Sequence, residues 1–203
     1  MTISVDTRSS IVAEEAVRAG ADLINDVSAG SHDPAMVAVS AATGRPMVFM
    51  HSRGNPETMT GLTEYDDPLV DSVSEELGRL LSTANEKIPR WMQFIDPGIG
   101  FAKTNKQNLQ LLHPENLKKF KCLLGNRPLL LGASRKRFIK NVLGGGPDVS
   151  ESDLDLGTYS ACCSGILGGT EIVRVHNVQG VRKVCDVTSA IVFHSDDYET
   201  RND

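Results

Sequence analysis

The sequence has 203 residues, of which 40% are hydrophobic and 23% charged, a composition typical of one folded domain rather than of a disordered chain. Its 21 Lys and Arg against 26 Asp and Glu give a formal net charge of -5, whereas a general nucleic-acid or membrane-surface binder is expected to be basic. No apolar run approaches the roughly 20 residues needed to span a bilayer. We therefore expect neither nucleic acid nor membrane as a partner.

The cysteines and the start of the chain indicate the compartment. The four cysteines form no CxxC motif and no spacing with His typical of a zinc site, so we expect buried thiols in a reducing environment. Residues 1–5 lack the basic start and apolar stretch of a signal peptide. We expect a cytoplasmic protein, and the sequence leaves a mitochondrial location open for a longer chain.

Short apolar segments bounded by turn residues alternate with amphipathic segments along the chain, which predicts alternating strands and helices. The predicted strands are residues 3–6, 23–25, 47–51, 92–96, 129–132 and 172–176. The predicted helices are residues 9–19, 34–43, 68–88, 114–124, 135–143, 155–167 and 179–191. Two long loops, 52–67 and 97–107, are expected to be functional or mobile. Residues 1–193 are predicted to form one domain, and 194–203 a polar tail.

Six βα units are compatible with an open doubly wound sheet or with part of an eight-stranded barrel, which typically has about 250 residues. No GxGxxG or GxxxxGK[ST] loop follows any predicted strand, which removes the strongest support for a nucleotide-binding open sheet. The first predicted strand also begins almost at Met1. The fold class we expect is therefore α/β, an incomplete TIM (β/α)8 barrel with about six βα units and the first two missing.

Polar residues stand at or just after the carboxyl end of every predicted strand, where parallel α/β folds bind ligands. They lie at positions 6–8, 25–26, 51–53, 96, 134–137, 174 and 176–177. Any one of them could instead cap a helix or form a turn, but capping alone is a poor explanation for all six strand ends. Isolated His32, His113 and His194 are assigned to the surface or to caps, and Tyr65 and Trp91 to packing.

Two of these strand ends suggest binding chemistry. Asp96 is followed by Pro97 and Gly98, so its carboxylate could accept two parallel hydrogen bonds from a guanidine-like or amino-heterocycle edge, although an ion-paired or capping Asp is the alternative. Phe101 is either core or a stacking platform. Arg135 to Arg137 are three cations at the predicted start of a helix, where the dipole favours an anion between them.

The last predicted strand adds further cationic groups. Arg174 and His176 alternate with valines, so both should project from one face of the strand. If two strands precede the chain, Ser134 to Arg137 and Arg174 to His176 follow strands seven and eight, where barrels often hold phosphate. An anion site is therefore predicted here, against the alternative of a merely solvated basic turn.

At these residues the sequence resembles dihydropteroate synthase, the pterin-binding barrel enzyme of folate biosynthesis. The matching segments run in family order and are residues 4–7, 20–30, 47–54, 56–59, 95–103, 132–138 and 174–176. The resemblance implies condensation of p-aminobenzoate with 6-hydroxymethyl-7,8-dihydropterin pyrophosphate to give dihydropteroate and pyrophosphate. It also implies the two substrates as partners, a homodimer, and a possible fusion to other folate-pathway domains.

The resemblance also implies roles for individual residues. Asp6, Asn25 and Asp96 would hydrogen-bond the pterin edge, Met50 would pack on its ring, and Lys136 would reach its carbonyl and ring nitrogen. Arg174 and His176 would hold the pyrophosphate, so that Lys136, Arg174 and His176 are the expected catalytic residues. The remaining substrate-binding residues would be Phe101, Gly132, Ser134, Arg135 and Arg137, with Phe101 and the Arg135 to Arg137 segment flanking p-aminobenzoate.

Several expectations concern what the chain lacks. In the family an asparagine on the leading strand helps to bind Mg²⁺ and two mobile loops complete the p-aminobenzoate pocket, but no counterpart precedes Met1. Mg²⁺ is thus expected as a cofactor, with no metal-ligating residue assigned in this chain. Two alternatives stay open: a methyltetrahydrofolate-binding methyltransferase, and a non-catalytic pterin-binding or scaffold subunit.

Overall fold

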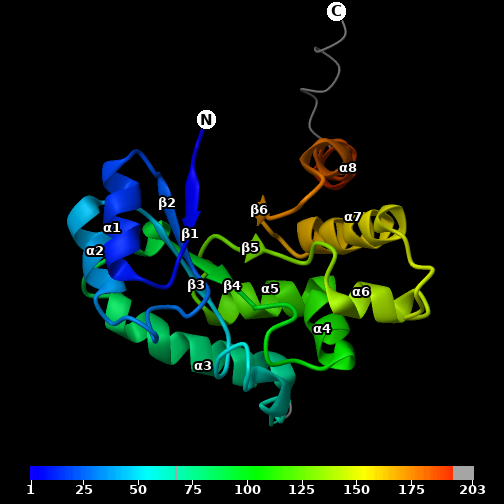
Figure 1. The fold of residues 1–203 in the computed structure, drawn as a ribbon, viewed down its shortest axis with the longest axis horizontal. Helices are drawn as coiled ribbons and strands as arrows, with labels where there is room; N and C mark the ends of the chain where they lie inside the picture. The colour runs from blue at the N-terminus through cyan, green and yellow to red at the C-terminus, as the bar shows by residue number, and fades with distance from the viewer. Residues whose placement is uncertain (67, 194–203) are drawn as a thin grey trace, which may run out of the picture.

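The structure is a computed structural model that describes residues 1–66 and 68–193. In this part of the chain six short strands alternate with helices, which confirms the predicted order (Figure 1). The strands are β1 (Ser4–Asp6), β2 (Leu23–Asp26), β3 (Met47–Met50), β4 (Gln93–Asp96), β5 (Leu130–Leu131) and β6 (Ile172–Val173). The helices are α1 (Ser10–Arg18), α2 (Met36–Thr43), α3 (Leu69–Ala84), α4 (Asn105–Leu112), α5 (Pro114–Leu123), α6 (Arg137–Val142), α7 (Glu151–Leu167) and α8 (Val178–Phe193), with 3-10 turns at Met59–Gly61 and Arg90–Met92.

All the strand pairs are parallel, because a helical segment returns the chain to the same end of the sheet before each new strand. β1 to β4 form one sheet in chain order, and β5 pairs with β6. A single parallel bridge between Ile95 and Leu129 joins the two sheets. Among the described residues β1 and β6 are the two end strands, so the fold is an α/β arc of six βα units, part of a TIM barrel, as predicted.

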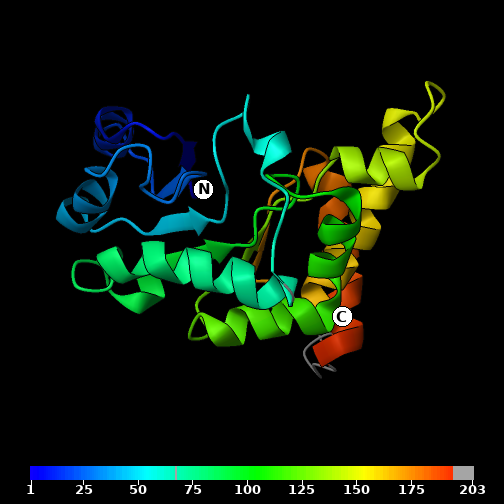
Figure 2. The ribbon, with the colours of Figure 1, turned by 90° about the horizontal axis from the view of Figure 1, so that it is seen from below.

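The core lies between the strands and the helices that cover their outer face. α3 has buried apolar residues at positions 69, 70, 73, 77 and 81, a helical spacing that gives one apolar face. α3 and α5 run side by side beneath the strands (Figure 2), where Leu77, Phe120 and the strand residue Phe49 are fully buried. This layer leaves the carboxyl ends of the strands at one rim.

Local backbone chemistry explains where the structure departs from the predicted elements. Helix α4, which the sequence analysis missed, begins with a capping box in which Thr104 and Gln107 cap each other's backbone. Helix α6 begins at Arg137 instead of residue 135, because Arg135 has φ 54 and cannot join a right-handed helix. β6 ends at Val173, so Arg174 and His176 follow the strand and do not alternate along it.

Two smaller predictions about packing are wrong. Trp91 is 72% exposed and does not pack in the core, and Cys122 is exposed, whereas Cys162 is buried. The predicted polar tail, which includes His194, lies outside the described residues. No helix in the described ranges is both long and apolar enough to cross a bilayer.

Candidate active site

The predicted site residues of the first four strands occupy equivalent places at the rim. Asp6 and Asp96 are the last residues of β1 and β4, Asn25 is the next-to-last residue of β2, and Met50 is the last residue of β3. The sheet register pairs Asp6 with Asn25 and Met50 with Asp96. Parallel pairing therefore brings these side chains to one edge from segments far apart in sequence.

Asp6 connects the two end strands of the arc. Its Oδ1 accepts a hydrogen bond of 2.7 Å from the Asn25 amide, and its Oδ2 accepts one from the Arg174 guanidinium. The ion pair is partly open to solvent, with 58% of the Arg174 side chain and 45% of the Asp6 side chain exposed. Arg174 therefore stands at the rim, where an anionic ligand can reach it and compete with Asp6.

Asp96 is a buried carboxylate at the centre of the rim. It is 6% exposed, and its Oδ1 accepts a hydrogen bond of 2.7 Å from the amide of Gly98. Burial raises the pKa of Asp96, while Lys136, the Gly98 amide, Lys103 and Arg174 oppose that rise. A buried carboxylate surrounded by cations can stay ionised and accept hydrogen bonds from a polar ligand.

Lys136 reaches into the same region from the segment that follows β5. Its ammonium donates to the carbonyl of Ile99 and lies 4.6 Å from the centre of the Phe101 ring, a favourable cation–π distance. A β-carbon on Gly100 would lie 2.9 Å from Cδ of Lys136, so the absence of a side chain at Gly100 makes room for the Lys136 side chain. Burial lowers the pKa of Lys136, and the Asp96 carboxylate opposes this effect.

Ser134 and His176 form a pair beside Arg174. The serine Oγ accepts a hydrogen bond of 3.2 Å from the backbone amide of His176 and lies 2.8 Å from Nδ1 of the same residue. Because the hydroxyl has one proton, it can donate that proton to Nδ1, which leaves the imidazole proton on Nε2. The exposed ring of His176 would then present an N–H donor to a ligand.

The other two cations of the 135–137 segment do not join this cluster in the structure. Arg135 makes two hydrogen bonds, of 2.8 and 3.1 Å, to Asp155 of α7 and one of 3.0 Å to Glu151. Arg137 is exposed. Since α6 is short and Arg135 is already paired, the predicted anion site depends on Arg174, His176 and Lys136. The roles of Arg135 and Arg137 stay predictions.

Gly132, another predicted site residue, lies close to Asp96. A β-carbon built on Gly132 would be 4.0 Å from Oδ2 of Asp96.

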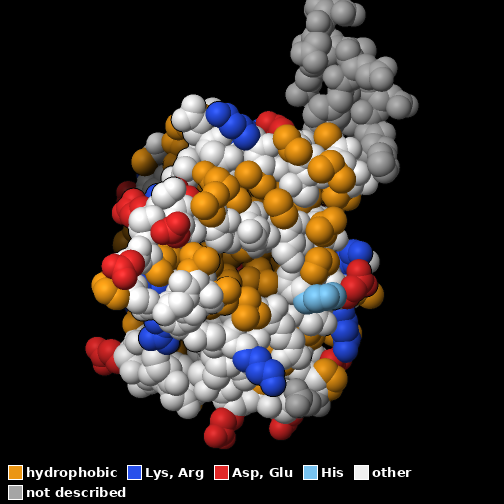
Figure 3. All heavy atoms as spheres, turned by 90° about the vertical axis from the view of Figure 1, so that its right-hand side faces the viewer, with side chains coloured by type: hydrophobic (Ala, Val, Ile, Leu, Met, Phe, Trp, Pro, Cys, Tyr) orange, Lys and Arg blue, Asp and Glu red, His pale blue; other side chains and the backbone are white. Residues whose placement is uncertain are grey.

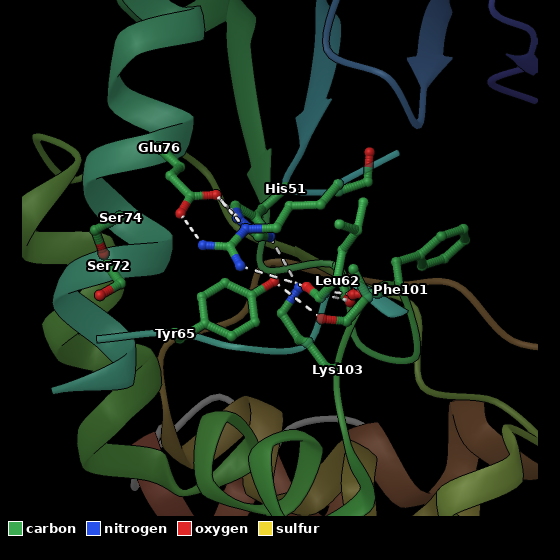
Figure 4. A network of polar contacts seen from close by, with 12 residues as sticks. His51, Leu62, Tyr65, Ser72, Ser74, Glu76, Phe101 and Lys103 are labelled. Carbon is green, nitrogen blue, oxygen red and sulfur yellow. Dashed lines mark hydrogen bonds and ion pairs between the residues drawn. The ribbon is translucent and has the colours of Figure 1, made fainter. Parts of the chain in front are cut away.

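The sequence analysis missed a partly buried polar network beneath the rim (Figure 4). Nζ of Lys103 lies 2.9 Å from Nδ1 of His51, and Nε2 of His51 lies 3.1 Å from the Glu76 carboxylate. Arg53 binds the same carboxylate through Nε and Nη2 and lies 3.7 Å from the centre of the Tyr65 ring. Glu76 could have been noticed as an acid on α3 next to the buried position of Leu77.

Burial and hydrogen bonding shift the ionisation of this network. Burial lowers the pKa of His51 to about 4 and that of Lys103 to about 7. Hydrogen bonds from Arg53 and His51 lower the pKa of Glu76 to about 2. At neutral pH the network therefore contains a neutral imidazole between an ionised carboxylate and a lysine that titrates near neutrality.

The described residues line several hollows, and two of them bear on the site. One adjoins the rim and is lined by residues of the loops that follow β1 to β4, among them Arg8, Ser28, Ser52, Asn55 and Phe101. The other is apolar and lies on the outer face among α4, α6 and α7, where hydrophobic side chains gather around it (Figure 3). Only the first hollow shares a residue, Phe101, with the predicted site.

The donors of the described residues do not fit a resident metal ion. In residues 1–66 and 68–193 no group of three or more His, Cys, Asp and Glu side chains is placed to hold a metal. The described residues therefore provide no set of protein ligands for Mg²⁺.

Comparison with known proteins identifies the family. The profile described as pterin binding enzyme matches residues 1–176. The dihydropteroate synthase of Synechocystis is 42% identical over 194 residues, which cover 93% of this chain and 63% of that protein. A protein of Arabidopsis thaliana named "Folate synthesis bifunctional protein, mitochondrial" is 43% identical over 194 residues, which cover 91% of this chain and 34% of that protein.

Solved structures give the same result. The dihydropteroate synthase of Thermus thermophilus in complex with 6HMPPP has a TM-score of 0.83 and 34% identity, over 95% of this chain and 73% of that one. A structure of the Thermus enzyme with 4-aminobenzoate has a TM-score of 0.84 at the same identity, over 95% of this chain and 75% of that one. The chain thus spans about a quarter to three quarters of the length of the proteins it matches. Because the profile covers most of its length, the chain belongs to the family of pterin binding enzymes.

Proposed function

We propose that this chain carries the pterin and pyrophosphate sites of a dihydropteroate synthase. The reaction joins p-aminobenzoate to the methylene carbon of 6-hydroxymethyl-7,8-dihydropterin pyrophosphate and releases pyrophosphate. The observation that carries the proposal is the arrangement at the strand ends of the buried Asp96, of Asp6 hydrogen-bonded to Asn25, and of Arg174 paired with Asp6. The Thermus complexes with 6HMPPP and 4-aminobenzoate support the two substrates.

The pterin would bind along the rim. Asp96 would accept hydrogen bonds from its amino group and ring N–H, a bidentate arrangement that an ionised carboxylate favours. Asn25 and Asp6, which are already hydrogen-bonded to each other at 2.7 Å, would complete the polar edge. Met50 is 3% exposed and would contribute apolar contact beneath the ring, while Lys136 would reach the pterin carbonyl and ring nitrogen.

The pyrophosphate would bind Arg174 and His176. Arg174 would exchange its Asp6 partner for phosphate oxygens, and the imidazole of His176, oriented by Ser134, would donate to the same group. These donors would stabilise the charge that develops on the leaving group as the carbon–oxygen bond breaks. The bond to oxygen breaks with its electron pair going to the pyrophosphate, and the amine nitrogen forms the new bond to carbon.

The p-aminobenzoate would enter from the hollow lined by Phe101, Ser28 and Ser52. The Phe101 ring would lie along the benzoate ring, and the guanidinium of Arg8, which also lines the hollow, would receive its carboxylate. No side chain is needed as a strong base, because an aniline nitrogen is an adequate nucleophile toward an electron-poor methylene. Its extra proton can leave to water after bond formation.

Two other functions would use the same pocket. A methyltetrahydrofolate-binding methyltransferase would need the pterin contacts but not the cations at Arg174 and His176. A non-catalytic pterin-binding subunit would bind the substrate without turnover. The relatives named dihydropteroate synthase favour the first proposal over both.

The test is calorimetric titration of the full chain with the pterin pyrophosphate in the presence of Mg²⁺, after a check that it melts cooperatively. Binding that falls at least tenfold on Asp96→Asn, but not on the exposed control Lys106→Met, would support the pterin site. Chromatography after addition of p-aminobenzoate then detects dihydropteroate. Product supports the synthase, whereas binding without product favours the non-catalytic subunit and no binding contradicts both.

We also propose a homodimer formed through α7 and α8. Helix α7 exposes Leu156 at 60%, and α8 exposes Val187, Ile191 and Phe193 at 61%, 66% and 64%, and a second copy could cover these apolar side chains. Sedimentation of the parent and of Ile191→Glu tests this, since the charged variant should shift the protein to the monomer. Mg²⁺, fusion to other folate-pathway domains and a cytoplasmic location stay proposals, supported only by the resemblance and, for fusion, by the bifunctional Arabidopsis relative.

A further inference from the structure

We propose that Lys103 and His51, held by Glu76 and Arg53, are positioning residues that fix the loop carrying Asp96 and Phe101 and help to keep Asp96 ionised. The inference rests on the proposed function, because it concerns the same pterin site. None of the four residues was assigned a role in binding substrate. Lys103 and His51 make the contacts to the loop and to Asp96, and Glu76 lies beside His51 on the side of α3 (Figure 4).

The contacts of Lys103 account for all three protons of its ammonium group. Nζ is 3.2 Å from the carbonyl of Gly98, 3.1 Å from that of Phe101 and 2.9 Å from Nδ1 of His51. The residue is 7% exposed, so water does not compete freely for these bonds. One side chain therefore joins both ends of the turn between Gly98 and Phe101 to the end of β3.

His51 transmits this connection to helix α3. Because Nδ1 accepts from Lys103, the ring proton belongs on Nε2, from which it can be donated to Glu76 at 3.1 Å. The His51 backbone amide also donates to the Asp96 carbonyl at 2.9 Å. The histidine thus holds both the backbone of Asp96 and the lysine that supports the following turn.

Arg53 and Tyr65 provide a second connection to the same loop. Arg53 binds Glu76 through two nitrogens and stacks on the Tyr65 ring. The Tyr65 hydroxyl donates to the Ala102 carbonyl at 3.0 Å. The loops after β3 and β4 are therefore tied together at two places, through Lys103 and through Tyr65, and a change in one is expected to move the other.

The charge of Lys103 gives the network an electrostatic effect. Asp96 is faced by Lys136 from the segment after β5, by Lys103 from its own loop and by Arg174 from the segment after β6, and all three lower its pKa against the effect of burial. Lys103 is in turn faced by Asp96, by Lys136 from the segment after β5, by Glu76 of α3 and by Arg53. Removing the Lys103 cation should therefore favour protonation of Asp96, which cannot then accept two hydrogen bonds from the pterin.

The experiment compares the parent with Lys103→Met and with the control Lys106→Met, which removes an exposed lysine of α4. The affinity for the pterin pyrophosphate is measured by calorimetry from pH 5 to pH 8. We expect Lys103→Met to bind the pterin pyrophosphate about tenfold more weakly than the parent at neutral pH. We also expect its affinity to fall on acidification at a pH about one unit higher than in the parent, because one unit of pKa corresponds to a tenfold change. The proposal would be overturned if Lys103→Met had the affinity of the parent and lost it on acidification at the same pH as the parent.

A second measurement separates failure of this inference from failure of the proposed function. Hydrogen exchange of the Gly98, Gly100 and Phe101 amides is followed without ligand, and we expect about tenfold faster exchange in Lys103→Met than in the parent or the control. If the parent does not bind the pterin, the proposed function fails and exchange alone decides whether Lys103 holds the loop. If Lys103→Met does not fold, His51→Gln replaces it in both measurements, and parental behaviour of that variant contradicts the proposal.

Discussion

Gly98 lies directly against the backbone of His51: a β-carbon built on Gly98 would be 1.9 Å from the His51 carbonyl oxygen. Gly98 also has φ 68, in the left-handed region that other residues avoid. The turn after Asp96 therefore packs directly against the backbone at the end of β3. Sterics and conformation both require glycine here.

Gly98→Ala is therefore expected to lose more than about 3 kcal/mol of unfolding free energy, since it adds a clash with backbone to the strain of a left-handed residue. Urea denaturation measures this loss. The matched control is Gly44→Ala, because Gly44 has φ 63 but nothing within 4 Å of its built β-carbon, so only the conformational cost of about 1–2 kcal/mol should appear. Equal losses in the two variants would contradict the role of the His51 contact.

Tyr65→Phe is expected to destabilise the protein by about 1 kcal/mol, because the buried Ala102 carbonyl loses its 3.0 Å hydrogen bond. The ring itself stays in place over Arg53. The same variant should speed exchange of the amides in the loop after β4 without abolishing folding. Denaturation and hydrogen exchange together check this, and a variant as stable as the parent would show that the hydroxyl contributes nothing.

The rim residues could be predicted from the sequence because their positions depend on a local pattern. A short buried strand ends in a polar residue, and parallel pairing carries Asp6, Asn25 and Asp96 to one edge without knowledge of any side-chain contact. Alternation of strands and helices likewise predicted all six strands of the arc. These inferences need only the periodicity of the chain and the rule that ligands bind at the carboxyl ends of strands.

The network beneath the rim could not be predicted in this way. Lys103 and His51 are 52 residues apart, and His51 and Glu76 are 25 residues apart, so only the folded chain shows that they touch. The left-handed backbone of Arg135 is equally invisible in the sequence, and it shifts the start of α6 and directs the guanidinium to Asp155. Tertiary contacts, not residue types, decided which of the three cations at 135–137 faces the rim.

Arg174→Gln is expected to weaken binding of the pterin pyrophosphate by at least about tenfold while leaving binding of the unphosphorylated 6-hydroxymethyl pterin nearly unchanged, because guanidinium groups contribute most to phosphate contacts. Calorimetry with both ligands measures the difference. The control is Arg79→Gln, which removes an exposed arginine of α3 paired with Glu75. An equal loss for the two ligands would place Arg174 at the pterin rather than at the pyrophosphate.

Below pH 7 the protonation of His51 and Glu76 should lower the stability of the protein in two overlapping steps. The folded protein holds the pKa of His51 at about 4, below its ordinary value of 6.5, so between pH 6.5 and about 4 the unfolded chain binds a proton that the folded one does not. Stability therefore rises with pH in this window and is lost as the pH falls through it. The pKa of Glu76, lowered from 4.5 to about 2, adds a further loss between pH 4.5 and about 2.

His51→Gln removes the first of these steps. The free energy of unfolding is measured by urea denaturation at pH 7, 6, 5 and 4. It should decline less steeply with falling pH in this variant than in the parent. The variant should nevertheless be less stable at pH 7, because the hydrogen bonds to Lys103 and Glu76 are disturbed. His32→Gln changes an exposed histidine and should keep the parental slope. A parental slope in His51→Gln would mean that the buried imidazole is not the group that links folding to pH above 4.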